Sequence, residues 1–122
     1  MLPFKVIGVK NTSKHTVLGE QIILANNPLL RLKGLLGFHQ LPESYGLWLT
    51  PCNSIHMFFM SIALDVVFLD KDLFVIEILE NFKPWHVSKI YAKAKHVLEL
   101  PVGVVQHTKT CIGDQLAMHI EN

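Results

Sequence analysis

The sequence predicts a mainly β protein with a minor α component: a single-domain β-sandwich or jelly-roll-like barrel of short, mostly antiparallel strands. Two observations support this fold class. Short apolar runs bounded by turn residues recur at fairly regular spacing along the chain, and only residues 28–36 carry the apolar spacing of a helix. The chain has 122 residues, half of them hydrophobic, which is enough to form one core. Residues 1–122 are therefore expected to be one domain.

The amino-terminal residues are predicted to form a β-hairpin. Side chains alternate in character from Phe4 to Val9, polar turn residues occupy positions 11–15, and a run rich in β-branched residues extends from Val17 to Ala25. Because β-branched side chains fit the pleated surface of a sheet, both runs are expected to be strands.

One short helix is predicted near residues 28–36. Asn27 can accept hydrogen bonds from the free amides at its start, and Pro28 is tolerated at the first helical position. Four leucines share one side of this segment, and Gly37 supplies a left-handed stop. Arg31 lies off that apolar side, where it is either solvated or paired through its guanidinium with a carboxylate or another anion.

The rest of the chain supplies a second hairpin and the remaining strands. The hairpin extends from Asp65 to Glu80, with turn residues at positions 70–72. The other strand-like segments are Gly46–Thr50, Ser54–Met60, Val97–Leu100 and the alternating end of Cys111–Ile120.

Composition argues against a nucleic-acid partner. The formal net charge is +1, which gives no global electrostatic footprint for nucleic acid or an acidic membrane. Residues 81–96 do interleave four lysines and two histidines with Trp85 and Tyr91, a pattern that can track a nucleic-acid backbone. A solvated lysine-rich loop explains this segment equally well, so no nucleic acid is expected to bind.

The chain shows no targeting or membrane-spanning pattern. Its amino terminus lacks the basic region, apolar run and cleavage site of a secretory signal. The densest apolar stretch is interrupted by polar residues and falls short of a transmembrane helix. We therefore expect a cytoplasmic protein, or an exported one whose leader has been removed. Cys52 and Cys111 are expected to be free thiols.

A candidate ligand-binding site is predicted around the most apolar stretch, Pro51 to Asp70. His56, Met60 and Asp65 lie within it, and Glu99 lies between two leucines further along the chain. Burial of such groups perturbs their proton affinity, which is typical of functional sites. We expect Arg31 to pair with Asp65 or Glu99, leaving His56 at the mouth of a shallow apolar groove.

Two other interpretations of these residues remain open. In the structural one, His56 is satisfied by a backbone carbonyl, while Asp65 and Glu99 are hydrogen-bonded to loop amides. In the enzymatic one, His56 and Asp65 form the acid–base pair of a small hydrolase, which requires hydrogen-bond reach and a solvent-accessible cavity. The favoured function is a binding or accessory module for an unidentified small molecule or protein.

A zinc site is a weaker alternative. Cys52-x3-His56 and His107-x3-Cys111 together offer the two thiolates and two imidazoles of a closed zinc site. However, four residues of extended chain span about 13 Å, so a Cys and a His at this spacing do not share an ion unless the chain turns. No metal or other cofactor is therefore expected.

Several separated motifs occur along the chain: Arg31-x-x-Gly34-Leu35-Leu36-Gly37, Gly46-Leu47, Pro51-Cys52-x-Ser54-Ile55-His56-x-Phe58-x-Met60, Asp65-Val66-Val67-Phe68-Leu69-Asp70, Val97-Leu98-Glu99-Leu100-Pro101-x-Gly103 and Gly113-Asp114. In this order they resemble the domain of unknown function 192 family, also filed as uncharacterised protein family 0127, over about residues 17–118. The resemblance implies a compact β-sandwich-like, jelly-roll-related domain with a short helix. It implies no reaction, cofactor or catalytic residue.

This sequence departs from the family pattern at several positions. Phe59 stands where the family often has Gly, and such a large ring would fill space otherwise open to a ligand. Met57, Ala63 and Phe38 are smaller departures. His107 and Cys111 have no counterpart in the pattern, which further weakens the zinc alternative.

Overall fold

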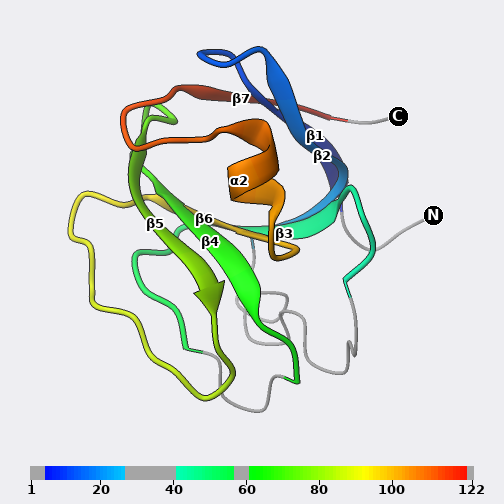
Figure 1. The fold of residues 1–122 in the computed structure, drawn as a ribbon. Coiled ribbons are helices and arrows are strands. Elements are labelled where there is room, and N and C mark those ends of the chain that lie inside the picture. The colour runs from blue at the N-terminus through cyan, green and yellow to red at the C-terminus, as the bar shows by residue number, and fades with distance from the viewer. Residues whose placement is uncertain (1–4, 27–40, 57–60, 121–122) are drawn as a thin grey trace.

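The computed structural model describes residues 5–26, 41–56 and 61–120, which form a curled seven-stranded sheet and one short helix (Figure 1). The predicted helix near residues 28–36 lies outside the described residues. The strands are β1 (Lys5–Asn11), β2 (Thr16–Ala25), β3 (Tyr45–Leu49), β4 (Leu64–Leu69), β5 (Val75–Phe82), β6 (His96–Leu100) and β7 (Leu116–Ile120), and the helix is α2 (Val104–Thr108).

The predicted mainly β class is confirmed. The strand order is β5-β4-β6-β3-β2-β1-β7, and every neighbouring pair is antiparallel except the parallel pair β2 and β3. Both predicted hairpins are present, as β1 with β2 and as β4 with β5.

The sheet curls so far that its two edge strands meet at one end. The backbone amide of Val75 donates to the carbonyl of Asp114 at 2.8 Å, and that of Leu116 donates to Leu73 at 2.9 Å. Figure 1 shows the chain before β7 beside the start of β5. The result is a half-barrel that these contacts close at one end.

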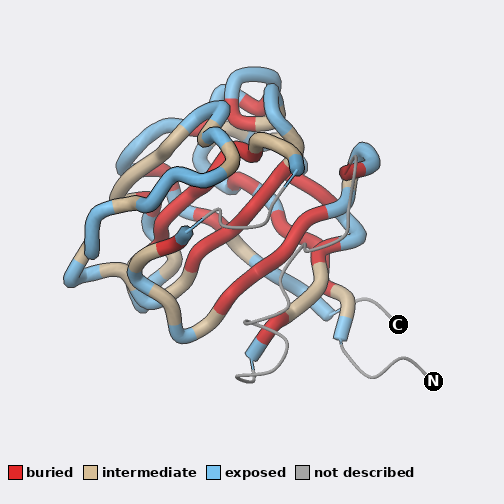
Figure 2. The backbone as a smooth tube through the Cα atoms, turned by 90° about the horizontal axis from the view of Figure 1, so that it is seen from below, coloured by how far each residue is buried: buried red, intermediate tan, exposed pale blue. Residues whose placement is uncertain are grey.

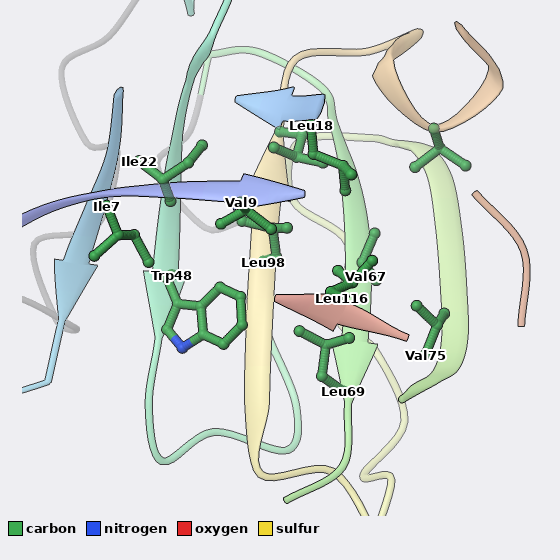
Figure 3. Close-up of a cluster of buried hydrophobic side chains, with 12 residues drawn as sticks. Ile7, Val9, Leu18, Ile22, Trp48, Val67, Leu69, Val75, Leu98 and Leu116 are labelled. Atoms are coloured by element: carbon green, nitrogen blue, oxygen red, sulfur yellow. The ribbon is translucent and has the colours of Figure 1, made fainter. Parts of the chain in front are cut away.

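Side chains on the two faces of the sheet form two separate clusters. The inner-face cluster includes Val75 from β5 and Leu116 from β7, and α2 contributes Val105 to it, so this face lies inside the curl (Figure 3). The outer-face cluster contains Leu47, Val66 and alternate residues of the same central strands, together with Ile55 from a loop. The central strands are therefore buried on both faces, as the red tube in Figure 2 shows.

Two details differ from the sequence-based expectation. Within Ser54–Met60, the described residues 54–56 form a loop with one isolated bridge rather than a strand, because Ile55 pairs with Ser88 of another loop. The helix α2 was not predicted, since five residues are too few to show a helical period. No helix in the described part of the chain is long and apolar enough to span a bilayer.

Candidate functional site

Asp65 lies on β4 with its carboxylate fully engaged by backbone amides. Its Oδ1 accepts a hydrogen bond from Asn81 at 3.0 Å, and its Oδ2 accepts from Gly103 at 3.0 Å and Val105 at 3.1 Å. The last two amides lie at the start of α2. Amides at the start of a helix have no hydrogen-bond partner within the helix, so they need an acceptor from elsewhere. Asp65 therefore ties the end of β5 and the start of α2 to the centre of the sheet.

Glu99 lies on β6 in the middle of an aliphatic row on the outer face. Its direct cross-strand neighbours are Leu47 on β3 and Val66 on β4. Beyond them the same row continues to Ile23 on β2 and Leu79 on β5. Glu99 thus places one carboxyl group among aliphatic side chains on both sides.

The Glu99 side chain is nearly buried and lacks a hydrogen-bond partner among the described residues. Glu99 keeps only 7% of its accessible surface, and burial raises the pKa of its carboxyl to about 7. In the described part of the chain, every wholly inaccessible side-chain nitrogen or oxygen has a hydrogen-bond partner. Glu99 therefore keeps a small part of its surface accessible.

The structure does not bring Asp65 and Glu99 together. Across β4 and β6, Asp65 is paired with Leu100 and Val66 is paired with Glu99. Because successive side chains of a strand point to opposite faces, Asp65 lies on the inner face and Glu99 on the outer face. The two carboxyls therefore do not form one cluster, and a single guanidinium cannot contact both of them.

His56 is exposed and lies at the edge of the loop that follows Cys52. Its backbone forms an isolated antiparallel bridge with Val87, so it belongs to the contact between two loops rather than to the sheet. Arg31 and Met60 lie outside the described residues. Among the predicted ligand-binding residues, the structure therefore describes His56 at the surface and the two carboxyls on opposite faces.

The four residues of the zinc alternative are not gathered. Over residues 5–26, 41–56 and 61–120, no group of three or more His, Cys, Asp or Glu side chains is placed to hold a metal. Neither Cys52 nor Cys111 is part of a disulfide. Cys52 donates a hydrogen bond from Sγ to the carbonyl of Ser54 at 3.0 Å, a local contact within its own loop.

The comparisons with known proteins agree with the motifs. The model of the family described as "Uncharacterized ACR", domain of unknown function 192, matches residues 9–118. The chain belongs to this family. A UPF0127 protein of Pyrococcus horikoshii is 28% identical over 113 residues, which cover 88% of this chain and 96% of that protein. A UPF0127 protein of Thermococcus sibiricus is 40% identical over 68 residues, covering 56% of this chain and 44% of that longer protein.

Two solved structures of low sequence identity share the fold. A protein of unknown function from Novosphingobium aromaticivorans matches with a TM-score of 0.79 and 23% identity, covering 93% of this chain and 84% of that one. A putative transcription regulator from Sinorhizobium meliloti matches with a TM-score of 0.78 and 23% identity, covering 94% and 93% of the two chains. At this identity the likeness shows the fold alone.

In this family member the Gly113-Asp114 motif anchors a polar network that its local sequence pattern does not reveal. Gly113 has φ of 96°, a left-handed conformation that favours glycine. Asp114 accepts hydrogen bonds from Asn11 at 2.9 Å, from the Cys111 amide at 2.9 Å and from Lys14 Nζ at 2.8 Å. Burial raises the pKa of Asp114, but the hydrogen bonds from Asn11 and Lys14 outweigh it and hold the pKa below its ordinary value.

Proposed function

We propose that this protein is a binding module whose outer sheet face holds a ligand with an apolar body and one cationic group, and that Glu99 receives that group. The observation that carries the proposal is the Glu99 carboxyl: Glu99 is more than nine-tenths buried in an aliphatic row, its carboxyl has no hydrogen-bond partner among the described residues, and the residue keeps a small part of its surface accessible. The ligand is a small molecule or a segment of a protein partner.

The energetic argument starts from the cost of burying this carboxyl. An ionised group taken out of water without a partner destabilises the folded state by several kcal/mol. A leucine or valine at position 99 would continue the row of Leu47 and Val66 without that cost. A residue that opposes folding in this way is a candidate for function, because functional sites are where local stability rules are broken.

A cationic ligand fits this carboxyl better than a neutral or anionic one. An ammonium or guanidinium donates hydrogen bonds to the carboxylate and supplies the compensating charge that the described surroundings lack. Leu47 and Val66 beside the carboxyl are buried, so the partly exposed ends of the row, Ile23 and Leu79, offer apolar contact to the rest of the ligand. Hydrogen bonds to charged groups contribute about 1.5–3 kcal/mol, which corresponds to roughly 10-fold to 100-fold in affinity.

The test uses hexylamine as the probe and hexanol as its uncharged control. Hexylamine is expected to shift the methyl NMR signals of Leu47 and Val66, and Glu99→Gln is expected to weaken its binding at least about 10-fold while leaving hexanol unaffected. Because ionisation of Glu99 increases as pH rises through about 7, hexylamine should bind more tightly at pH 8 than at pH 6. An unchanged affinity in the variant, or no shift at either methyl group, would contradict the proposal.

A second candidate is acid–base catalysis at Glu99. A carboxyl with a pKa of about 7 can both accept and donate a proton near neutral pH, as general acids and bases do. Asp65, the partner expected from the sequence, would first have to release the backbone amides that occupy both of its oxygens. Glu99 is therefore the better placed carboxyl for such a reaction.

The two candidates differ in turnover. The enzymatic candidate predicts hydrolysis of 4-nitrophenyl acetate beyond one equivalent, with a rate that changes around pH 7 and is lost in Glu99→Gln. The binding module predicts a stoichiometric complex with hexylamine and no turnover that depends on Glu99.

We also infer a reducing compartment such as the cytoplasm for this protein. The support is that Cys52 and Cys111 are not joined in a disulfide, since exported proteins more often carry their cysteines as disulfides. Thiol titration of protein purified directly under alkylating conditions should give two reactive groups after unfolding. Recovery of an intramolecular or intermolecular disulfide in that sample would contradict this inference.

A further inference from the structure

The loop of residues 83–95, which we call the basic loop, displays three large apolar side chains to solvent. Trp85 is 60% exposed, Val87 is 61% exposed and Ile90 is 73% exposed. They lie within six consecutive residues, so they occupy one small region of the surface. Exposed apolar side chains that occur together in this way mark an interaction site, whereas single ones are ordinary.

The basic loop is fixed to the body of the protein by its other residues. The amide of Ser88 donates to the carbonyl of Ile55 at 2.9 Å, and the amide of Tyr91 donates to Asn53 at 2.9 Å. The Tyr91 ring packs against Phe68 of the outer-face cluster, with ring centroids 4.5 Å apart. The loop is therefore held in place by its inward-facing residues. Its exposed apolar side chains project into solvent from this fixed position.

The same loop carries four lysines, none of which forms an ion pair with another described residue. Its four lysines are all exposed, and residues 81–98 contain no acidic side chain. The one ion pair in the described part of the chain joins Lys14 to Asp114, in another region of the sequence. The lysines of the basic loop are Lys83, Lys89, Lys93 and Lys95.

We propose that the basic loop docks the protein on an anionic membrane surface, with Trp85, Val87 and Ile90 entering the interface and the lysines contacting lipid phosphates. Tryptophan prefers the headgroup region of a bilayer. Lysine keeps its charged end in water while its alkyl chain covers apolar surface. Apolar burial and attraction to anionic lipids act together in surface-bound proteins.

Other macromolecules fit this surface less well. Single-stranded nucleic acid needs several exposed rings for stacking, but Trp85 is the one ring among the three exposed side chains, and Val87 and Ile90 have no π face. The basic loop also contains no arginine, the residue favoured for forked contacts to phosphates and bases. Lysine is depleted in protein–protein interfaces, which argues against a protein partner here.

The experiment measures binding of the whole chain to phosphatidylcholine vesicles with and without phosphatidylserine. The protein is expected to sediment with the phosphatidylserine vesicles and to be released by salt, because charge screening weakens attraction to anionic lipids. Fluorescence should shift to shorter wavelength on binding. Trp48 is wholly buried, so this shift reports Trp85 and should disappear in Trp85→Phe.

Two variants with matched controls separate the contributions. Ile90→Asp is expected to lower the vesicle partition coefficient about 10-fold, whereas Ile112→Asp, at another well exposed isoleucine outside the basic loop, should leave it unchanged. Lys89→Gln is expected to lower the vesicle partition coefficient about 5-fold. The matched control Lys10→Gln, outside the basic loop, should leave the coefficient unchanged.

Three outcomes would overturn the membrane proposal. One is binding to phosphatidylserine vesicles that is no stronger than binding to pure phosphatidylcholine. Another is equal vesicle binding by Ile90→Asp and Ile112→Asp. The third is retention of polyuridylate RNA at a salt concentration that releases the protein from vesicles, which would assign the basic loop to nucleic acid.

Discussion

Replacing Glu99 by glutamine should remove most of the dependence of stability on pH near neutrality. The carboxyl has a pKa of about 7 in the folded protein and an ordinary value of 4.5. A folded-state pKa that lies above the unfolded value means that the folded state binds more protons between about pH 4.5 and 7. Stability contributed by the protonated group is therefore present at acidic pH and lost as pH rises through the folded-state pKa.

The magnitude follows from that difference in pKa. At about 1.36 kcal/mol for each pKa unit, the wild-type protein should lose about 3 kcal/mol relative to Glu99→Gln between about pH 4 and pH 8. With urea slopes of about 1–3 kcal/mol per molar, the difference between the two unfolding midpoints should change by roughly 1–3 M. The assay is urea unfolding followed by circular dichroism at a series of pH values.

An exposed glutamate provides the control for this experiment. Glu20 lies on β2 and is exposed, so Glu20→Gln should reproduce the pH dependence of the wild-type protein. If Glu99→Gln also shows the pH dependence of the wild-type protein, burial does not raise the pKa of the Glu99 carboxyl in the folded state. That result would refute the argument from its burial.

Three further predictions concern the frame around this site. Asp65→Ala should lower the free energy of unfolding by about 3 kcal/mol or more, because one buried and two partly buried hydrogen bonds from backbone amides lose their carboxylate acceptor; faster hydrogen exchange at Gly103 would locate the effect, and an unchanged urea midpoint would contradict it. Gly46→Ala should destabilise the protein by about 1–3 kcal/mol, since the new Cβ would lie 2.5 Å from a backbone oxygen of Glu99; wild-type stability in urea would refute this close approach. Asp114→Asn should lower the free energy of unfolding at neutral pH and make that free energy fall less steeply as the pH becomes acidic. A carboxylate whose pKa is lower in the folded state stabilises the protein above its unfolded-state pKa, and this stability is lost as pH falls. An acid-unfolding curve equal to that of the wild type would show that Lys14 and its network contribute nothing.

Local patterns were sufficient to predict most of the sheet. The alternation in residues 4–9 and 17–25, with polar residues between them, predicts the β1–β2 hairpin because both strands and their turn are close in sequence. Apart from Asp65, β4 is wholly apolar, which is typical of a strand buried on both faces, and all six of its residues are buried. Glu99 was identifiable as unusual because two leucines flank it.

The register between distant strands could not be predicted. Asp65 and Glu99 are 34 positions apart in the sequence, and a shift of one residue would have placed both carboxyls on the same face. Their separation follows from the pairing of Asp65 with Leu100, a contact that neither local pattern specifies. The same limit applies to His56, whose bridge to Val87 joins two loops that are far apart in the chain.

The most direct test of the binding proposal is an NMR titration of the Glu99 side-chain carboxyl carbon, in the free protein and with hexylamine. The free carboxyl should titrate with a midpoint of about 7, and saturating hexylamine should move that midpoint downward because the cation stabilises the ionised form. A midpoint near the ordinary value of 4.5 in the free protein, or one that hexylamine leaves unchanged, would contradict the account.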